Sequence, residues 1–270
     1  MPVEKFTISR DDSVYECFPH LCRSRSGRIL ITYRESNGHV ASEFCRLIVR
    51  HSDDGGESWS DRRVLADESR DGGVMRTWNG PKIQQLQDGR ILLLCDTYEF
   101  PPGEWGVEND ARVIFFFSDD DGATFSAPLT TTVGGICPDQ VTEMPDGRWL
   151  LPANMRRATV DRLFQALHVS RDQGATWDPP TDLGQGSDLE LDEASVVRSV
   201  NGESVRDMDA LRGALERAMG SLIHIETQCG KCLVVKDVHG EARREDRAVA
   251  ERHRLPASAW TSGVWLRGAP

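Results

Sequence analysis

An octapeptide that occurs three times constrains this chain more than any other feature. The copies run over 52–59, 118–125 and 170–177, and they share the form Ser-x-Asp-x-Gly-x-(Ser/Thr)-aromatic. The pattern predicts a hairpin turn, because the Asp carboxylate can accept backbone N–H groups and the Gly tolerates a positive φ angle. The aromatic residue then begins the return strand and packs beneath the turn. Each copy is therefore expected to close one antiparallel pair of strands.

A Gly-Arg turn precedes each octapeptide. The glycines are Gly27, Gly89 and Gly147, and an apolar run follows each of them. A β-rich segment then leads into each octapeptide, over 46–50, 112–117 and 163–169. The succession of strand, tight turn, strand, loop, strand, Asp-containing turn and strand predicts a four-stranded unit. Four-stranded antiparallel units repeated in this way are typical of propeller blades.

Composition excludes several classes of protein. The 270 residues are 39% hydrophobic and 28% charged, which is enough apolar material to bury a core. No apolar run is long enough to span a membrane, and a net charge of −11 argues against nucleic-acid binding. The N-terminus shows no secretory signal and the seven cysteines are scattered, so a cytoplasmic location is expected. No metal or cofactor is expected, since Cys229 and Cys232 are interpreted as two thiols on a turn.

The octapeptides resemble the Asp-box of the sialidase (neuraminidase) superfamily, and the resemblance covers residues 10–200. It implies an incomplete β-propeller over 1–194, with three blades and the start of a fourth. The turn at Asn201-Gly202 fits either a fourth blade or a hairpin of the segment that follows, and the helical spacing downstream favours the hairpin. It also implies a glycoside hydrolase of the exo-sialidase type. That family uses a Tyr nucleophile, an Asp acid/base and an Arg triad that clamps the sialate carboxylate.

The chain departs from that pattern at the matching positions. Cys17 stands where the first Arg is expected, and no Tyr lies beyond Tyr98. The loop that should hold the acid/base Asp offers Glu35 and His39 instead. Ordinary sialidase catalysis is therefore not expected, and the principal hypothesis is a protein of this superfamily that acts on a glycan or binds one.

Two carboxylates are the candidate catalytic residues: Glu193, which matches the family's Glu, and Asp139. They would need to share one cleft. The predicted substrate-binding residues are Arg34, Glu35, His39, Trp78, Tyr98 and Arg156, and the same loops hold Asn79, Asp96, Trp105 and Asn154. Structural alternatives stay open: Arg34 can pair with Glu35, Trp78 can pack between blades, and Asp139 can cap a turn.

The repeat stops in the last third of the chain. Apolar residues at 205, 208, 211, 215 and 219 predict a helix over 204–219, followed by a strand pair at 222–226 and 232–235. With the stretch Val-Val-Arg-Ser-Val-Asn-Gly-Glu-Ser-Val, residues 195–260 resemble part of a PDZ-like domain of Deg-type (HtrA-like) proteases. The resemblance implies an α/β tail that binds a peptide strand by β-augmentation. Residues 261–270 are expected to form a flexible tail.

The predicted fold is therefore mainly β, an incomplete sialidase-like propeller joined to an α/β PDZ-like segment. Two rival hypotheses remain. The chain is a non-enzymatic interaction protein that binds peptide through its tail, or it is a truncated or rearranged reading frame, as the missing blades suggest.

Overall fold

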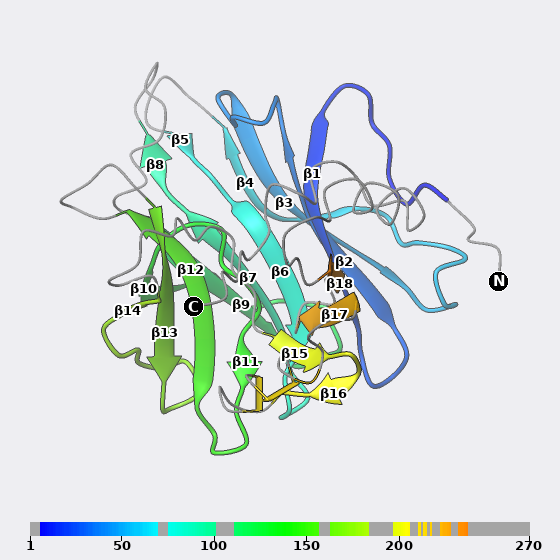
Figure 1. The fold of residues 1–270 in the computed structure, drawn as a ribbon. Helices are drawn as coiled ribbons and strands as arrows, with labels where there is room; N and C mark the ends of the chain where they lie inside the picture. The colour runs from blue at the N-terminus through cyan, green and yellow to red at the C-terminus, as the bar shows by residue number, and fades with distance from the viewer. Residues whose placement is uncertain are drawn as a thin grey trace. The chain divides into compact units, whose positions relative to one another are not determined.

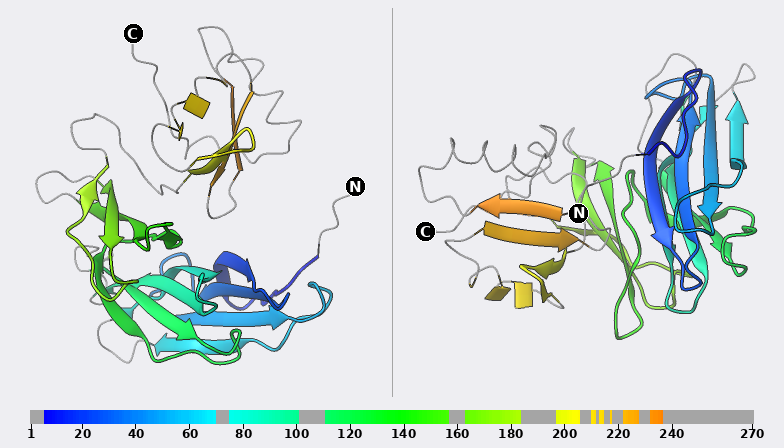
Figure 2. Two further views of the ribbon diagram at one scale, coloured as in Figure 1. Left: turned by 90° about the horizontal axis from the view of Figure 1, so that it is seen from below. Right: turned by 90° about the vertical axis from the view of Figure 1, so that its right-hand side faces the viewer.

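The structure is a computed structural model. It describes residues 6–69, 75–100, 111–156, 163–183, 197–205, 210–211, 213–214, 217, 222–227 and 232–236. The chain divides into two compact units, Met1–Glu190 and Leu191–Pro270, and strands dominate the described part of both (Figures 1 and 2). The predicted boundary at 194/195 lies outside the described residues and stays a prediction. No helix in the described part of the chain is long and apolar enough to cross a membrane.

Three four-stranded antiparallel sheets make up most of the first unit (Figure 1). The first sheet contains β1 (Tyr15–Arg23), β2 (Ile29–Ser36), β3 (Phe44–Ser52) and β4 (Arg63–Ser69). The second contains β6 (Asn79–Gln85), β7 (Ile91–Thr97), β9 (Arg112–Ser118) and β10 (Leu129–Gly134). The third contains β11 (Thr142–Glu143), β12 (Trp149–Arg156), β13 (Leu163–Ser170) and β14 (Thr181–Asp182). Strands neighbour one another in chain order within each sheet, so the predicted four-stranded units are confirmed. A small sheet of β5 (Met75–Arg76) and β8 (Glu99–Phe100) was not predicted.

The three sheets pack against one another through apolar faces. Successive side chains of a strand point to opposite faces, and β7 is apolar on both. Ile91 and Leu93 join a core cluster with Leu47 of the first sheet, while Leu92 and Leu94 join a second cluster with Leu151 of the third sheet. A strand buried on both faces reads as a continuous apolar run. The middle sheet is therefore the one that both cores share.

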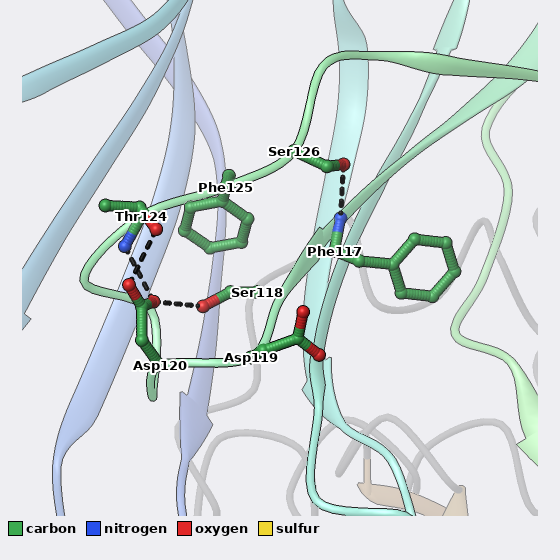
Figure 3. Close-up of a pocket in the computed structure, with 7 residues that line it drawn as sticks. All are labelled: Phe117, Ser118, Asp119, Asp120, Thr124, Phe125 and Ser126. Atoms are coloured by element: carbon green, nitrogen blue, oxygen red, sulfur yellow. Dashed lines mark hydrogen bonds between the residues drawn. The ribbon is translucent and has the colours of Figure 1, made fainter.

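The second octapeptide shows how the repeated turn is held (Figure 3). Asp120 accepts hydrogen bonds from the Thr124 backbone N–H (2.8 Å), the Thr124 hydroxyl (2.6 Å) and the Ser118 hydroxyl (2.8 Å). The same set of bonds recurs at Asp54 and Asp172. The predicted role of the carboxylate as an acceptor of turn hydrogen bonds is confirmed at all three copies. A surface hollow of about 340 Å³ beside Asp120 is lined by this turn itself.

The glycine of each octapeptide has the predicted positive φ angle. The prediction that the aromatic residue begins the return strand is wrong, because β4, β10 and β14 begin only at Arg63, Leu129 and Thr181. Gly122 has a φ of +79°, and a Cβ on it would lie 2.6 Å from Leu30 Cδ2 of the first sheet. Both the backbone angle and the close approach therefore require glycine there. The aromatic residues Trp59, Phe125 and Trp177 are partly buried and pack against the core clusters. The octapeptides are thus structural corners of the sheets.

The second unit contains a sheet of a different order. It runs β16 (Glu203–Ser204), β15 (Val197–Val200), β17 (Leu222–Thr227) and β18 (Cys232–Lys236). The predicted strand pair in this region is confirmed as β17 and β18. The described residues 210–211, 213–214 and 217 are helical, as the apolar spacing predicts, and Ala214 packs on Val200 and Ile225. Because β15 pairs with both β16 and β17, this sheet does not repeat the chain-ordered pattern of the first three. The PDZ-like comparison and the peptide ligand stay predictions.

Candidate functional site

The strands of the first unit's sheets have chemically different ends, and the side of the sheets where each set of ends lies is called an edge below. One edge, here called the turn edge, carries the octapeptides and the Gly-Arg turns. The opposite edge, here called the site edge, is where β2 and β7 end. There Cys17 of β1 pairs with Arg34, Asn79 of β6 pairs with Asp96, and Asn154 of β12 forms a bridge with Ile136. Most of the sequence-predicted binding residues that the structure describes belong to this edge.

A chain of polar side chains crosses the sheets at the site edge. Arg34 Nη1 donates to Asn79 Oδ1 (2.8 Å), and Asn79 Nδ2 donates to Asp96 Oδ2 (3.3 Å). Asp96 Oδ1 in turn accepts the backbone N–H of Cys137 (2.9 Å), just before the third sheet. The chain therefore links β2, β6 and β7 to the segment that leads into β11. Sequence analysis placed Asn79 and Asp96 in loops and gave neither a role. The loop assignment is wrong, because Asn79 begins β6 and Asp96 lies near the end of β7.

Arg34 is a buried guanidinium, with 2% of its surface exposed. Its Nη2 donates to the carbonyl of His39 (2.6 Å), and its Cζ lies 4.9 Å from the centroid of the Phe18 ring. The charge also lies beside Cys17: burial raises the pKa of that thiol, and the Arg34 charge acts in the opposite direction. The strand next to Cys17 thus places a guanidinium close to where the sequence resemblance expects one.

Asp96 is a fully buried carboxylate. Burial raises its pKa from 3.8 to about 7, because desolvation disfavours the charged form. The hydrogen bonds from Cys137 and Asn79 act in the opposite direction, since they stabilise the carboxylate. A group poised near neutral pH is typical of functional sites. The sequence signal for it is a carboxylate that ends the apolar run of β7.

Asp139 is also buried, with 5% of its surface exposed. Its backbone N–H donates to the carbonyl of Pro152 (3.1 Å), which fixes its main chain beside β12. Its side-chain Oδ1 is buried without a hydrogen-bond partner among the described residues. A buried polar atom without a partner is costly and calls for an explanation. A ligand hydroxyl is one group able to satisfy it.

Glu35 and His39 lie in different environments. Glu35 points to the opposite face of β2 from Arg34, and its buried carboxylate forms an ion pair with Arg62 (2.5 Å). The alternative of an Arg34–Glu35 pair is therefore wrong. His39 is exposed, and its ring makes edge contacts with Tyr15 and Phe18 at centroid distances of 6.1 and 5.7 Å. The three rings form an aromatic cluster beside Arg34 that sequence analysis did not predict.

The remaining predicted residues take three different places. Trp78 is buried in the core between the first two sheets and contacts Phe116, which agrees with the packing alternative. Tyr98 is partly buried against the same core. Arg156 ends β12, but its side chain lies outside the described residues, as does the whole of Glu193. The pairing of Glu193 with Asp139 stays a prediction. Among the described residues, no group of three His, Cys, Asp or Glu side chains is placed to hold a metal ion.

Fold and site together define a mainly β protein whose repeated Asp-box sheets carry buried polar groups at one edge. The family model for the BNR repeat-like domain matches residues 45–182, just over half of the chain, and the chain belongs to that family. A sialidase of Paraclostridium sordellii is 25% identical in an alignment 193 residues long, and the match covers 61% of this chain and 47% of the relative. The chain thus spans about half the length of this curated relative.

Solved structures show the same fold at low sequence identity. A protein of unknown function from Dyadobacter fermentans is 18% identical with a TM-score of 0.52, over 82% of this chain and 64% of that one. The NanB sialidase of Streptococcus pneumoniae is 13% identical with a TM-score of 0.51, over 86% of this chain and 51% of that one. These structures show a shared fold, while the family match and the sialidase relative support the relationship to the sialidase superfamily.

Proposed function

We propose that the first unit binds a glycan at its site edge, and that its three sheets are consecutive blades of a sialidase-type propeller. The carrying observation is the chain Arg34–Asn79–Asp96, which is buried at one edge of the sheets. Burying a charged guanidinium and a carboxylate is unfavourable unless both are hydrogen-bonded. Such networks concentrate where a fold must present polar groups to a ligand. At the turn edge, in contrast, the Asp at the third position of each octapeptide has its carboxylate engaged within its own turn.

The aromatic cluster supplies the second element that a sugar site needs. Tyr15 is 40% exposed, and its hydroxyl lies 3.4 Å from His39 Nδ1. Phe18 has a φ of +55°, which is uncommon for a bulky residue. The register of β1 against β2 shifts between Cys17 and His20, at this point of the strand. Strain of this kind gathers at ligand-binding sites, and exposed rings beside amides and carboxylates suit a pyranose, which has apolar C–H faces and polar edges.

A glycan array probed with the full chain tests this proposal. We expect binding to a defined set of glycans and a loss of about fivefold in affinity for Tyr15→Ala, because an aromatic contact contributes on the order of 1 kcal/mol. Leu21→Ala is the matched control, since Leu21 is an exposed apolar residue of the same strand. Silence of the array, or equal losses in both variants, would contradict the proposal.

Hydrolysis is a second candidate, favoured by the buried and unpartnered Oδ1 of Asp139. In this proposal Asp139 is the catalytic carboxylate of the first unit, and its pairing with Glu193 stays a prediction from the sequence. A fluorogenic sialoside and a panel of neutral aryl glycosides test it. Release of the fluorophore by the wild type, together with its loss in Asp139→Asn, supports hydrolysis. A glycan that binds without any turnover would leave binding as the function.

A further inference from the structure

The segment 135–139, just before the third sheet, has a strained backbone. Gly135 has a φ of +111°, and a Cβ on it would lie 2.6 Å from the carbonyl oxygen of Asn154. Cys137 has a φ of +49°, in the left-handed region that side chains other than glycine disfavour. Such a conformation persists only where surrounding contacts hold it.

Most of the contacts that hold this segment come from neighbouring main chain. They are Gly135 N–H to Ala111 O (3.2 Å), the paired bonds between Ile136 and Asn154 (2.8 and 2.9 Å), and Asp139 N–H to Pro152 O (3.1 Å). At Cys137, the residue with the unfavourable φ, the acceptor is instead the Asp96 carboxylate at 2.9 Å. When ionised, a carboxylate makes a stronger hydrogen bond with a backbone N–H than a carbonyl does. A side-chain acceptor from β7 thus holds the strained non-glycine residue of the segment.

The second oxygen of Asp96 faces the other way along the polar chain. Oδ2 accepts from Asn79, whose own Oδ1 accepts from Arg34. Gly80 leaves room for this arrangement, because a Cβ on it would lie 3.3 Å from Asp96 Oδ1 and 3.7 Å from the Cα of Cys137. One buried carboxylate therefore connects the guanidinium of the first sheet to the strained segment beside the third.

We infer that Asp96 is a positioning residue of the site: it fixes the 135–139 segment against the Arg34–Asn79 pair and thereby presents Asp139 at the site edge. The role of Asp139 in this inference rests on the proposed glycan site. The hold of Asp96 on Cys137 does not, because it follows from the geometry alone. Asp96 acts through the segment and is not assigned a contact with the ligand.

Amide hydrogen exchange, read residue by residue by NMR on the full chain, tests the hold on Cys137. Asp96→Ala removes the acceptor, and we expect the Cys137 amide to exchange about tenfold faster, because a buried hydrogen bond is lost locally. Asp96→Asn keeps an oxygen that can accept the same N–H and is expected to stay close to the wild type. Asp88→Ala is the matched control: its carboxylate accepts the Arg90 N–H (2.9 Å) at the opposite end of the same hairpin. Unchanged exchange at Cys137 in Asp96→Ala, or equal acceleration of all core strands, would overturn the inference.

Glycan affinity, measured on the same variants, tests the consequence for the site. We expect Asp96→Ala to lose about tenfold in affinity. Asp96→Asn should lose less, because it keeps an acceptor for the Cys137 N–H, although its NH2 group replaces the oxygen that accepts from Asn79. Faster exchange at Cys137 without any change in affinity would overturn the positioning role. If the wild type binds no glycan, the proposed function fails, whereas the exchange data still decide whether Asp96 holds the segment.

Discussion

Replacing Asp96 by Asn is expected to change how the stability of the first unit depends on pH. Burial raises the pKa of Asp96 from 3.8 to about 7 in the folded protein. The unfolded chain has lost the proton above its lower pKa, while the folded protein still holds it, so the stability that this group contributes falls as pH rises. The loss is about 1.4 kcal/mol per pH unit well below the folded pKa, and it levels off above that pKa. Between pH 6 and 8.5 the relation gives a total loss of about 1.4 kcal/mol.

Urea unfolding of both proteins, followed by tryptophan fluorescence at half-unit steps of pH, measures this effect. Asn does not titrate, so the free energy of unfolding of the wild type minus that of Asp96→Asn should decrease by about 1.4 kcal/mol from pH 6 to 8.5. Histidines and other groups contribute to both proteins and cancel in the difference. A difference that stays constant, or that moves in favour of the wild type as pH rises, would refute the argument that burial dominates the pKa of Asp96.

Three further substitutions test a glycine contact between sheets and a buried ion pair. Gly122→Ala should lower the free energy of unfolding in urea by about 2–4 kcal/mol, because it combines a positive φ with overlap onto Leu30. Gly147→Ala is the comparison: with φ +85° and nothing within 4 Å of the added Cβ, it should lower that free energy by only about 1–2 kcal/mol. Equal losses would remove the packing argument. Glu35→Gln should destabilise by about 1–3 kcal/mol, because the buried carboxylate loses its charge opposite Arg62, and a change below about 0.5 kcal/mol would show the ion pair to be worth no more than a surface pair.

Local repeats made the sheets of the first unit predictable. Each octapeptide contains its own hydrogen-bond donors, acceptor and glycine, so the turn follows from eight consecutive residues. The polar contacts of the site edge, in contrast, do not follow from any one short stretch of sequence. Arg34, Asn79 and Asp96 come from three strands and meet only when the sheets pack, and Phe18 joins them through a register shift in β1. Periodicity reports which face of a strand is buried, but not which polar side chain will meet another across two sheets.

Cys17 also shows what could not be predicted from the sequence. Compared position by position with the sialidase pattern, Cys17 stands where an arginine is expected. In the sheet, Cys17 is the Cα partner of Arg34, whose guanidinium lies next to the thiol. The positive charge of this corner of the site is therefore supplied by the neighbouring strand. The Nη1 and Nη2 of Arg34 donate to Asn79 and the His39 carbonyl, which suits a scaffold that orders the site, whereas its Nε is buried without a hydrogen-bond partner among the described residues.

The pKa values of aspartates shift in opposite directions at the two edges. The direction depends on whether the hydrogen bonds that the carboxylate accepts outweigh the cost of burying its charge. At the turn edge the Ser/Thr residues of each octapeptide donate hydrogen bonds to an exposed carboxylate and stabilise its charged form. The bonds from Thr124 contribute most and lower the pKa of Asp120 to about 2. At the site edge Asp96 accepts fewer bonds and is fully buried, so desolvation prevails and its pKa rises. The Asp of each octapeptide, whose hydrogen-bond donors lie in the same octapeptide, therefore has a structural role in these three sheets. An Asp that ends an apolar strand without local donors is the one to test for function.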